Sequence, residues 1–130
     1  MENLYIDCGR CSVNKHDESL CGDSFNLLRS DDTLTAVLSD GLGSGVKANI
    51  LSTLTATILS TLLARRLPVE ECVDTMASTL PMCKQRKLAY STFTALQVDG
   101  LRARLIQFDN PHAILLRGGK SKKYSTQVYF

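Results

Sequence analysis

Hydrophobic and polar positions follow a pattern that predicts strands first, then two helices, then strands again. Short apolar, β-branched runs bounded by turn residues are typical of strands. Such runs cover residues 5–14, 24–29, 33–39, 92–98, 101–108, 113–117 and 124–130. Gly9 weakens the first run. A polar turn joins the runs 24–29 and 33–39, so these two should pair antiparallel.

Residues 46–66 carry the longest helical pattern, and Leu67-Pro68 separates it from a second one over residues 69–80. One apolar stripe of the first helix should face the core, and it consists of Leu51, Leu54, Ile58 and Leu62, widened by Ile50 and Leu59. The stretch 48–64 carries no charge, but it is short and rich in serine and threonine. This favours a core helix over a membrane span.

This order of elements predicts an α+β fold, with antiparallel sheets and with the helices grouped on one face. The length fits a single domain over residues 1–130. Asp99-Gly100 lies between two strand patterns and predicts a hairpin. The basic residues 117–123 are expected to form a solvated turn, and Cys72 and Met76 are expected to pack in the core.

Charge and cysteine content indicate the class of partner and the cellular compartment. The formal net charge is +2, from 15 basic and 13 acidic residues. This balance gives no support to a nucleic-acid-binding protein or to contact with an anionic membrane. Residues 1–4 lack the basic and apolar regions of a signal peptide, and five cysteines, an odd number, suggest reduced thiols. We therefore expect a cytoplasmic protein.

The strongest candidate chemistry lies in residues 39–46. Asp40 ends an apolar strand pattern, and glycines follow at positions 41, 43 and 45 before a helix begins near Ser44. A hard cation needs oxygen ligands, and bare glycine backbone lets a carbonyl approach beside a carboxylate. Two alternatives stay open: a dinucleotide-binding turn, although Val46 occupies the third glycine position of that motif, and a plain strand-to-helix turn with a solvated aspartate.

A second acid should lie near the first. If the strands 24–29 and 33–39 form a hairpin, Asp23 at its start and Asp40 at its end lie at the same end of the sheet. Asp31 and Asp32 then lie at the opposite end, as solvated turn residues. The hairpin therefore brings together two carboxylates that are distant in the sequence.

A rival metal site lies near the amino terminus. Cys8, Cys11, His16 and Cys21 have the spacing C-x2-C-x4-H-x4-C, which resembles a retroviral-type zinc knuckle, and their side chains suit zinc. Lys15 stands where that motif has glycine, and aromatic residues inside the loop are missing. The alternative is a strand with buried thiols followed by a polar loop.

Four motifs, in this order and spacing, resemble one known family. They are Gly22-Asp23-Ser24-Phe25, Ser39-Asp40-Gly41-Leu42-Gly43-Ser44-Gly45, Tyr90-Ser91-Thr92 and Asn110-Pro111-His112-Ala113-Ile114-Leu115-Leu116-Arg117-Gly118-Gly119. The chain resembles the PPM-type, metal-dependent serine/threonine phosphatase domain, in its stage II sporulation protein E branch. The resemblance implies two antiparallel sheets packed as a sandwich and flanked by helices (αββα).

The resemblance also implies an enzyme and its site. Asp23 would bind one ion, Asp40 would bridge two, and the carbonyl of Gly41 would complete one shell. The ions would be Mg²⁺ or Mn²⁺, and a water bridging them would hydrolyse phosphoserine or phosphothreonine. The substrate would be a phosphorylated regulatory protein, such as an anti-sigma-factor antagonist. Asp109 is expected to cap a turn and His112 to be structural, with a general-acid role for His112 as the alternative.

Two later carboxylate motifs of the family have no counterpart before Phe130, so half of the expected metal shell is missing. We therefore expect weak metal affinity and a chain that lacks the C-terminal part of the domain. The first hypothesis is an active phosphatase domain. The alternatives are a catalytically silent domain of the same fold that binds a partner, and a zinc-stabilised binding module.

Overall fold

The computed structural model describes residues 5–13, 22–30, 32–41, 45–79 and 92–124. The elements in chain order are β1 (Asp23–Arg29), β2 (Thr33–Asp40), α1 (Gly45–Ala64), α2 (Val69–Thr79), β3 (Thr92–Asp99), β4 (Arg102–Phe108), β5 (Leu115–Arg117) and β6 (Lys120–Lys122). The predicted α+β class with antiparallel strands is confirmed. The predicted bounds of β1 to β4 and of the two helices differ from the observed ones by a few residues at most.

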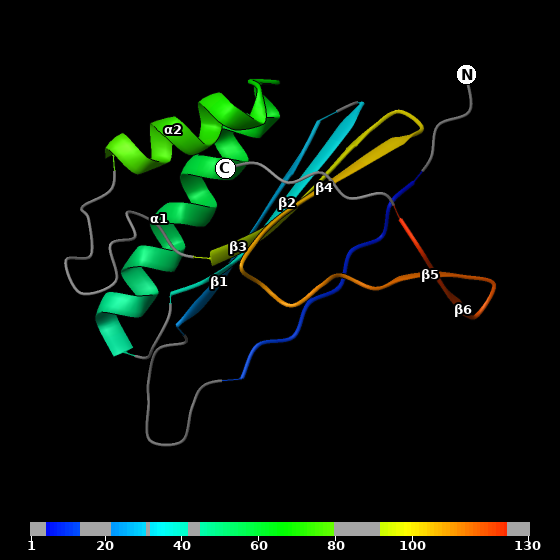
Figure 1. The fold of residues 1–130 in the computed structure, drawn as a ribbon, viewed down its shortest axis with the longest axis horizontal. Coiled ribbons are helices and arrows are strands. Elements are labelled where there is room, and N and C mark those ends of the chain that lie inside the picture. Colours follow the sequence, from blue (N-terminus) through cyan, green and yellow to red (C-terminus); the bar gives the residue numbers. More distant parts are fainter. Residues whose placement is uncertain (1–4, 14–21, 31, 42–44, 80–91, 125–130) are drawn as a thin grey trace.

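One four-stranded sheet forms the centre, with the strand order β1-β2-β3-β4 and antiparallel pairing throughout. Tight turns join β1 to β2 and β3 to β4. At the first turn the Ser30 N–H donates to the Thr33 carbonyl at 2.9 Å. At the second, Gly100 has φ +60°, as the Asp99-Gly100 hairpin signal requires. Figure 1 shows both helices on the same side of this sheet.

The hydrophobic core lies between α1, α2 and the helix-facing side of the sheet. Its buried members are Val37, Ala56, Leu59, Leu63, Val69, Cys72, Met76, Phe93, Ala95 and Ile106. The Phe93 and Phe108 rings stack across β3 and β4, with centroids 5.9 Å apart. Cys72 and Met76 are fully buried, as the sequence predicted.

The face of α1 that enters the core coincides only in part with the predicted stripe. Leu59 is fully buried, and Ile58 and Leu62 pack against the core. Ile50 and Leu54 are 52% and 40% exposed. The buried positions are mostly small: Ala48, Ser52, Thr55, Ala56, Leu59, Ser60 and Leu63. Short side chains let the helix lie close to the sheet, and this close approach decided which face turned inward.

Hydroxyl and amide groups join α1 to the edge strand β1. Ser24 Oγ lies 2.9 Å from both Ser52 Oγ and Thr53 Oγ1. Asn26 Nδ2 donates to Ser60 Oγ at 2.6 Å. Burying polar groups is tolerated here because these groups have hydrogen-bond partners.

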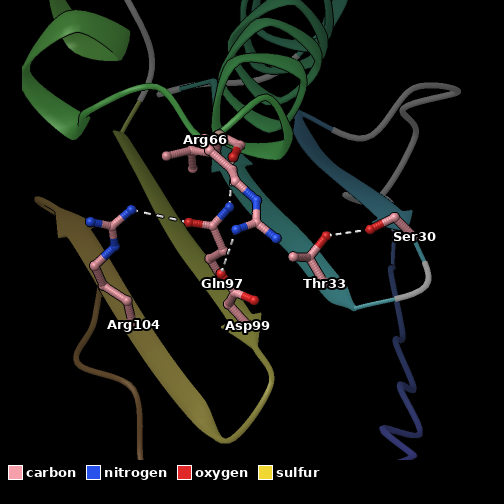
Figure 2. Close-up of polar contacts among 7 residues, drawn as sticks. Ser30, Thr33, Arg66, Gln97, Asp99 and Arg104 are labelled. Carbon is pink, nitrogen blue, oxygen red and sulfur yellow. Dashed lines mark hydrogen bonds and ion pairs between the residues drawn. The ribbon is translucent and has the colours of Figure 1, made fainter.

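The far end of the sheet holds the carboxyl end of α1 (Figure 2). Gln97 Nε2 donates to the Leu63 carbonyl at 2.6 Å, and Arg104 Nη2 donates to Gln97 Oε1 at 3.0 Å. Arg66 has φ +63° just past the helix, and its guanidinium pairs with Asp99 at 3.2 Å. Leu67 N–H then donates to the Leu62 carbonyl at 3.3 Å, a helix-ending bond that usually accompanies glycine at the preceding position.

One strand prediction and one turn prediction were wrong in the described residues. Residues 5–13 form no strand. The basic residues 117–123 do not form a simple turn, since Lys120–Lys122 pairs with Leu115–Arg117 as a two-stranded sheet. The predicted strand 124–130 begins at Tyr124, which lies outside any strand, and its other residues lie outside the described part of the chain.

Among the described residues, α1 is long and apolar enough to cross a membrane by length and composition alone, with a mean hydropathy of 1.3 over the best window. In the structure this helix packs along β1, β2 and β3.

Candidate active site

The two predicted acids lie side by side on neighbouring strands. In the β1–β2 ladder Asp23 pairs directly with Asp40. Directly opposed residues of an antiparallel pair project to the same face of the sheet. The Gly41 N–H donates to the Gly22 carbonyl at 2.9 Å, so the next pair outward is hydrogen-bonded. Asp23 and Asp40 are therefore a non-hydrogen-bonded pair, the closer kind, with roughly 4.5 Å between Cα atoms.

The acid pair lies on the face of the sheet opposite α1. Along β2 the fully buried Thr35, Val37 and Ser39 alternate with Leu38, which is 47% exposed, and with the half-buried Asp40. Asp23 is exposed. A cation could therefore reach both carboxylates from solvent.

Gly41 is buried beneath the start of α1. A Cβ built on it would lie 2.7 Å from the Cα of Ala48 and nearer still to the carbonyl of that residue. Any side chain here would therefore push the helix away from the end of β2. The absence of a Cβ explains why a glycine must follow Asp40, and it places the first turns of α1 directly behind the acid.

Strand β3 supports Asp40 from the other side. Thr92 pairs with Asp40 in the β2–β3 ladder and is buried. The buried Ser39 hydroxyl donates to the Thr92 carbonyl at 3.1 Å. Asp40 therefore sits between Asp23 and Thr92 on three neighbouring strands, in a backbone frame that resists displacement.

A polar cluster at the same end of the sheet was missed by sequence reasoning. Thr94 Oγ1 accepts hydrogen bonds from Asn110 Nδ2 at 3.1 Å and from Gln107 Nε2 at 3.4 Å. Gln107 Nε2 also donates to the Pro111 carbonyl at 3.0 Å. These bonds bring the Asn110-Pro111 motif to the end of the sheet that carries the acids. The alternation of Thr92 and Thr94 on a predicted strand was the available signal.

A cation lies against the strand that carries Asp23. The Arg10 guanidinium lies 5.4 Å from the centroid of the Phe25 ring, and its Nη1 donates to the Phe25 carbonyl at 3.4 Å. Phe25 is two residues from Asp23 and on the same face of β1. No sequence pattern pointed to this contact, because residues 5–13 reach β1 without forming a strand.

The remaining candidates are not brought into the acid pair. His112 is exposed, and Asp109 is exposed at a bend of the chain with φ +51°. Within the described part of the chain no group of three or more His, Cys, Asp or Glu residues could hold a metal ion. Cys8 and Cys11 of the zinc-knuckle hypothesis are exposed free thiols. Its other two members, His16 and Cys21, lie outside the described residues.

Comparison with known proteins finds similar sequences of one family. The family model of stage II sporulation protein E (SpoIIE) matches residues 30–128, which include Asp40 and Gly41. The phosphoserine phosphatase RsbX of Bacillus subtilis is 44% identical over 48 residues, which cover 37% of this chain and 24% of that protein.

Two solved structures match this chain. The PP2C phosphatase domain of SpoIIE from Bacillus subtilis, solved with a fragment of its regulatory domain, gives a TM-score of 0.54 at 21% identity, covering 71% of this chain and 33% of that one. RsbX in complex with magnesium gives a TM-score of 0.49 at 27% identity, covering 67% and 40%. The chain thus spans well under half of each relative. Because the family model covers most of the chain, the chain belongs to the stage II sporulation protein E family of PPM-type phosphatase domains.

Proposed function

We propose that the chain is the metal-binding part of a protein phosphatase domain that hydrolyses phosphoserine or phosphothreonine on a regulatory protein. The direct pairing of Asp23 with Asp40 carries this proposal, since it sets two carboxylates beside each other on the solvent-accessible face of the sheet. Membership of a phosphatase family and the resemblance to a phosphoserine phosphatase support the reaction class.

The donor atoms fit a hard divalent cation. Asp23 and Asp40 would supply carboxylate oxygens, and Gly41 would supply its carbonyl. All-oxygen ligation suits Mg²⁺ or Mn²⁺ better than zinc. The chemistry that such ions supply is neutralisation of the phosphate oxygens and acidification of water.

The protein's own groups prepare this site. The Ser39–Thr92 hydrogen bond and the Gly41–Gly22 backbone bond hold both acids in register. The glycine at position 41 lets the start of α1 pack closely against the end of β2, behind the strand that carries Asp40. With two carboxylates and one carbonyl as ligands, affinity for the ion should be low, in the millimolar range typical of weak sites.

Isothermal titration with MnCl₂ and hydrolysis of a phosphoserine peptide test the proposal together. Asp40→Asn should abolish both manganese binding and turnover, and Asp23→Asn should weaken both. Asp32→Asn is the matched control, because Asp32 is an exposed acid at the opposite end of the same hairpin. It should bind and react like the parent chain. Equal manganese binding by all three variants would refute the site.

One observation favours a second candidate, a catalytically silent domain that binds a partner. Within the described residues no third His, Cys, Asp or Glu joins the acid pair. If the parent chain binds manganese but shows no turnover at any metal concentration, this second function holds for the chain. Turnover that depends on Asp40 excludes it.

A further inference from the structure

Positive charge is concentrated on the β5–β6 hairpin. Residues 110–130 contain Arg117, Lys120, Lys122 and Lys123 and no aspartate or glutamate, in a chain whose formal net charge is only +2. Figure 1 shows the hairpin on the side of the molecule away from α1 and α2. Among the described elements, β5 and β6 contact only each other.

The ladder of this hairpin places its cations on one face. Arg117 pairs with Lys120, and Leu115 pairs with Lys122. Since paired residues share a face and alternate residues return to it, Arg117, Lys120, Lys122 and Leu115 all project to the same side. Like charges directly opposite each other destabilise a strand pair. No described residue forms a hydrogen bond or an ion pair with the side chains of these three cations.

The hairpin also exposes apolar side chains next to its charges. Ile114, Leu115 and Leu116 are 76%, 43% and 65% exposed. The turn is a two-residue hairpin turn in which both central residues have positive φ values, Gly118 at +61° and Gly119 at +75°. At the base, the Tyr124 hydroxyl donates to the Ala113 carbonyl at 2.7 Å. The surface is thus held in shape without being packed against the domain.

We propose that the β5–β6 hairpin is a docking surface for an acidic segment of the phosphoprotein substrate. This inference rests on the proposed phosphatase function and names the recognition element of its substrate. Acidic side chains would neutralise the repelling cations, and an apolar residue of the partner would cover Leu115, which shares their face. Charge pairs at the solvent-exposed edge of an interface mainly speed association and make it depend on salt concentration.

The arrangement favours a protein over a membrane or a nucleic acid. The tip of the hairpin is flanked by Arg117 and Lys120, while the leucines lie towards its base, so insertion into lipid would bury charges before apolar groups. Aromatic side chains for base stacking are missing from residues 110–123. Three cations beside the exposed Leu115 fit a partner that offers both acids and an apolar side chain.

Fluorescence anisotropy with a labelled probe tests the surface. The probe is a short phosphoserine peptide flanked by glutamates and leucines, and it is titrated with the full chain in EDTA so that no turnover occurs. Arg117→Gln/Lys120→Gln should weaken binding about tenfold, since two exposed charge pairs are lost. Arg65→Gln/Arg102→Gln is the matched control: it removes two exposed charges elsewhere and should change binding less than about twofold.

Three results would overturn the proposal: an equal loss in both double variants, unchanged binding of a probe whose glutamates are replaced by glutamine, or tighter hairpin-dependent binding of phosphatidylserine vesicles or a DNA duplex. The test is independent of the phosphatase proposal. Hairpin-dependent binding without hydrolysis in manganese supports docking while it removes the enzymatic function. Hydrolysis of the probe with the same KM in both double variants removes docking while the enzyme stands.

Discussion

Gly41→Ala is expected to destabilise the domain more than the same change at Gly9, Gly45, Gly100, Gly118 or Gly119. The added Cβ would meet the backbone of Ala48, at 2.7 Å from its Cα, and nothing in that contact is a flexible side-chain end. The helix would have to move by a large fraction of an ångström, or the end of β2 would have to bend. Either shift disturbs the acid beside it.

Overpacking of a well-packed interior costs about 1–3 kcal/mol, occasionally more. Because the clash is with main chain, we expect the upper end, about 3 kcal/mol, out of a total unfolding free energy of about 5–15 kcal/mol for a small domain. With a urea m-value of about 2 kcal/mol/M, the unfolding midpoint should fall by roughly 1.5 M.

Two other glycines calibrate the measurement. Gly9→Ala places its methyl in open space and should leave the midpoint unchanged. Gly100→Ala also meets no atom, but at φ +60° it should cost about 1 kcal/mol. Urea titrations followed by circular dichroism rank the three variants. A Gly41→Ala midpoint within experimental error of the Gly9→Ala midpoint would refute the close approach of α1 to β2.

Three further outcomes concern stability. Thr35→Val should stabilise the fold by about 1 kcal/mol, because the buried Thr35 hydroxyl has no hydrogen-bond partner among the described residues and valine keeps its shape. At position 66, where φ is +63°, glycine should be about 1 kcal/mol more stable than alanine, since both lose the exposed pair with Asp99 but only glycine accepts the backbone. Burial raises the pKa of the Cys72 thiol above its ordinary value of 9.0, an effect that Arg104 partly opposes. The unfolded thiol therefore ionises first, and stability should be full below pH 9.0 and fall as the pH rises towards the folded pKa.

Each of these outcomes has its own control in thermal or urea unfolding. Ser39→Ala removes a satisfied hydroxyl and should destabilise by about 1 kcal/mol, so a loss of stability in Thr35→Val as well would contradict the reasoning. Equal stability of Arg66→Gly and Arg66→Ala would show that the left-handed backbone costs nothing there. Cys72→Ala should flatten the alkaline slope relative to the parent, and an unchanged slope would assign it to other groups.

The part of the site that could be predicted from sequence is the part set by alternation and turns. Apolar runs separated by a short polar turn predict a hairpin, and the hairpin alone places Asp23 opposite Asp40. The Asp99-Gly100 turn was predicted for the same reason. Contacts between side chains of different elements had no such signal, so the Thr94–Asn110 bond and the position of Arg10 had to come from the structure.

The inward face of α1 shows why hydrophobicity alone can mislead. Leucines and isoleucines recur at helical spacing, but so do the small residues Ala48, Ser52, Thr55, Ala56 and Ser60. The sheet accepts the small face because its neighbours include Gly41 and the polar side chains of Ser24 and Asn26. Transfer free energy favours burying Leu54, but close backbone approach and satisfied hydroxyls outweighed it.

The length of the turn between β1 and β2 determines whether the two acids at the other end of the hairpin share a face of the sheet. Strand residues alternate between faces with a period of two, so one extra residue inserted between Ser30 and Thr33 could shift the ladder by one and send the two aspartates to opposite sides of the sheet. A natural relative with an odd change of length at that distant loop would then keep both acids in its sequence and still lose the ion. Counting residues in the turn is therefore as informative about metal binding as reading the acids themselves.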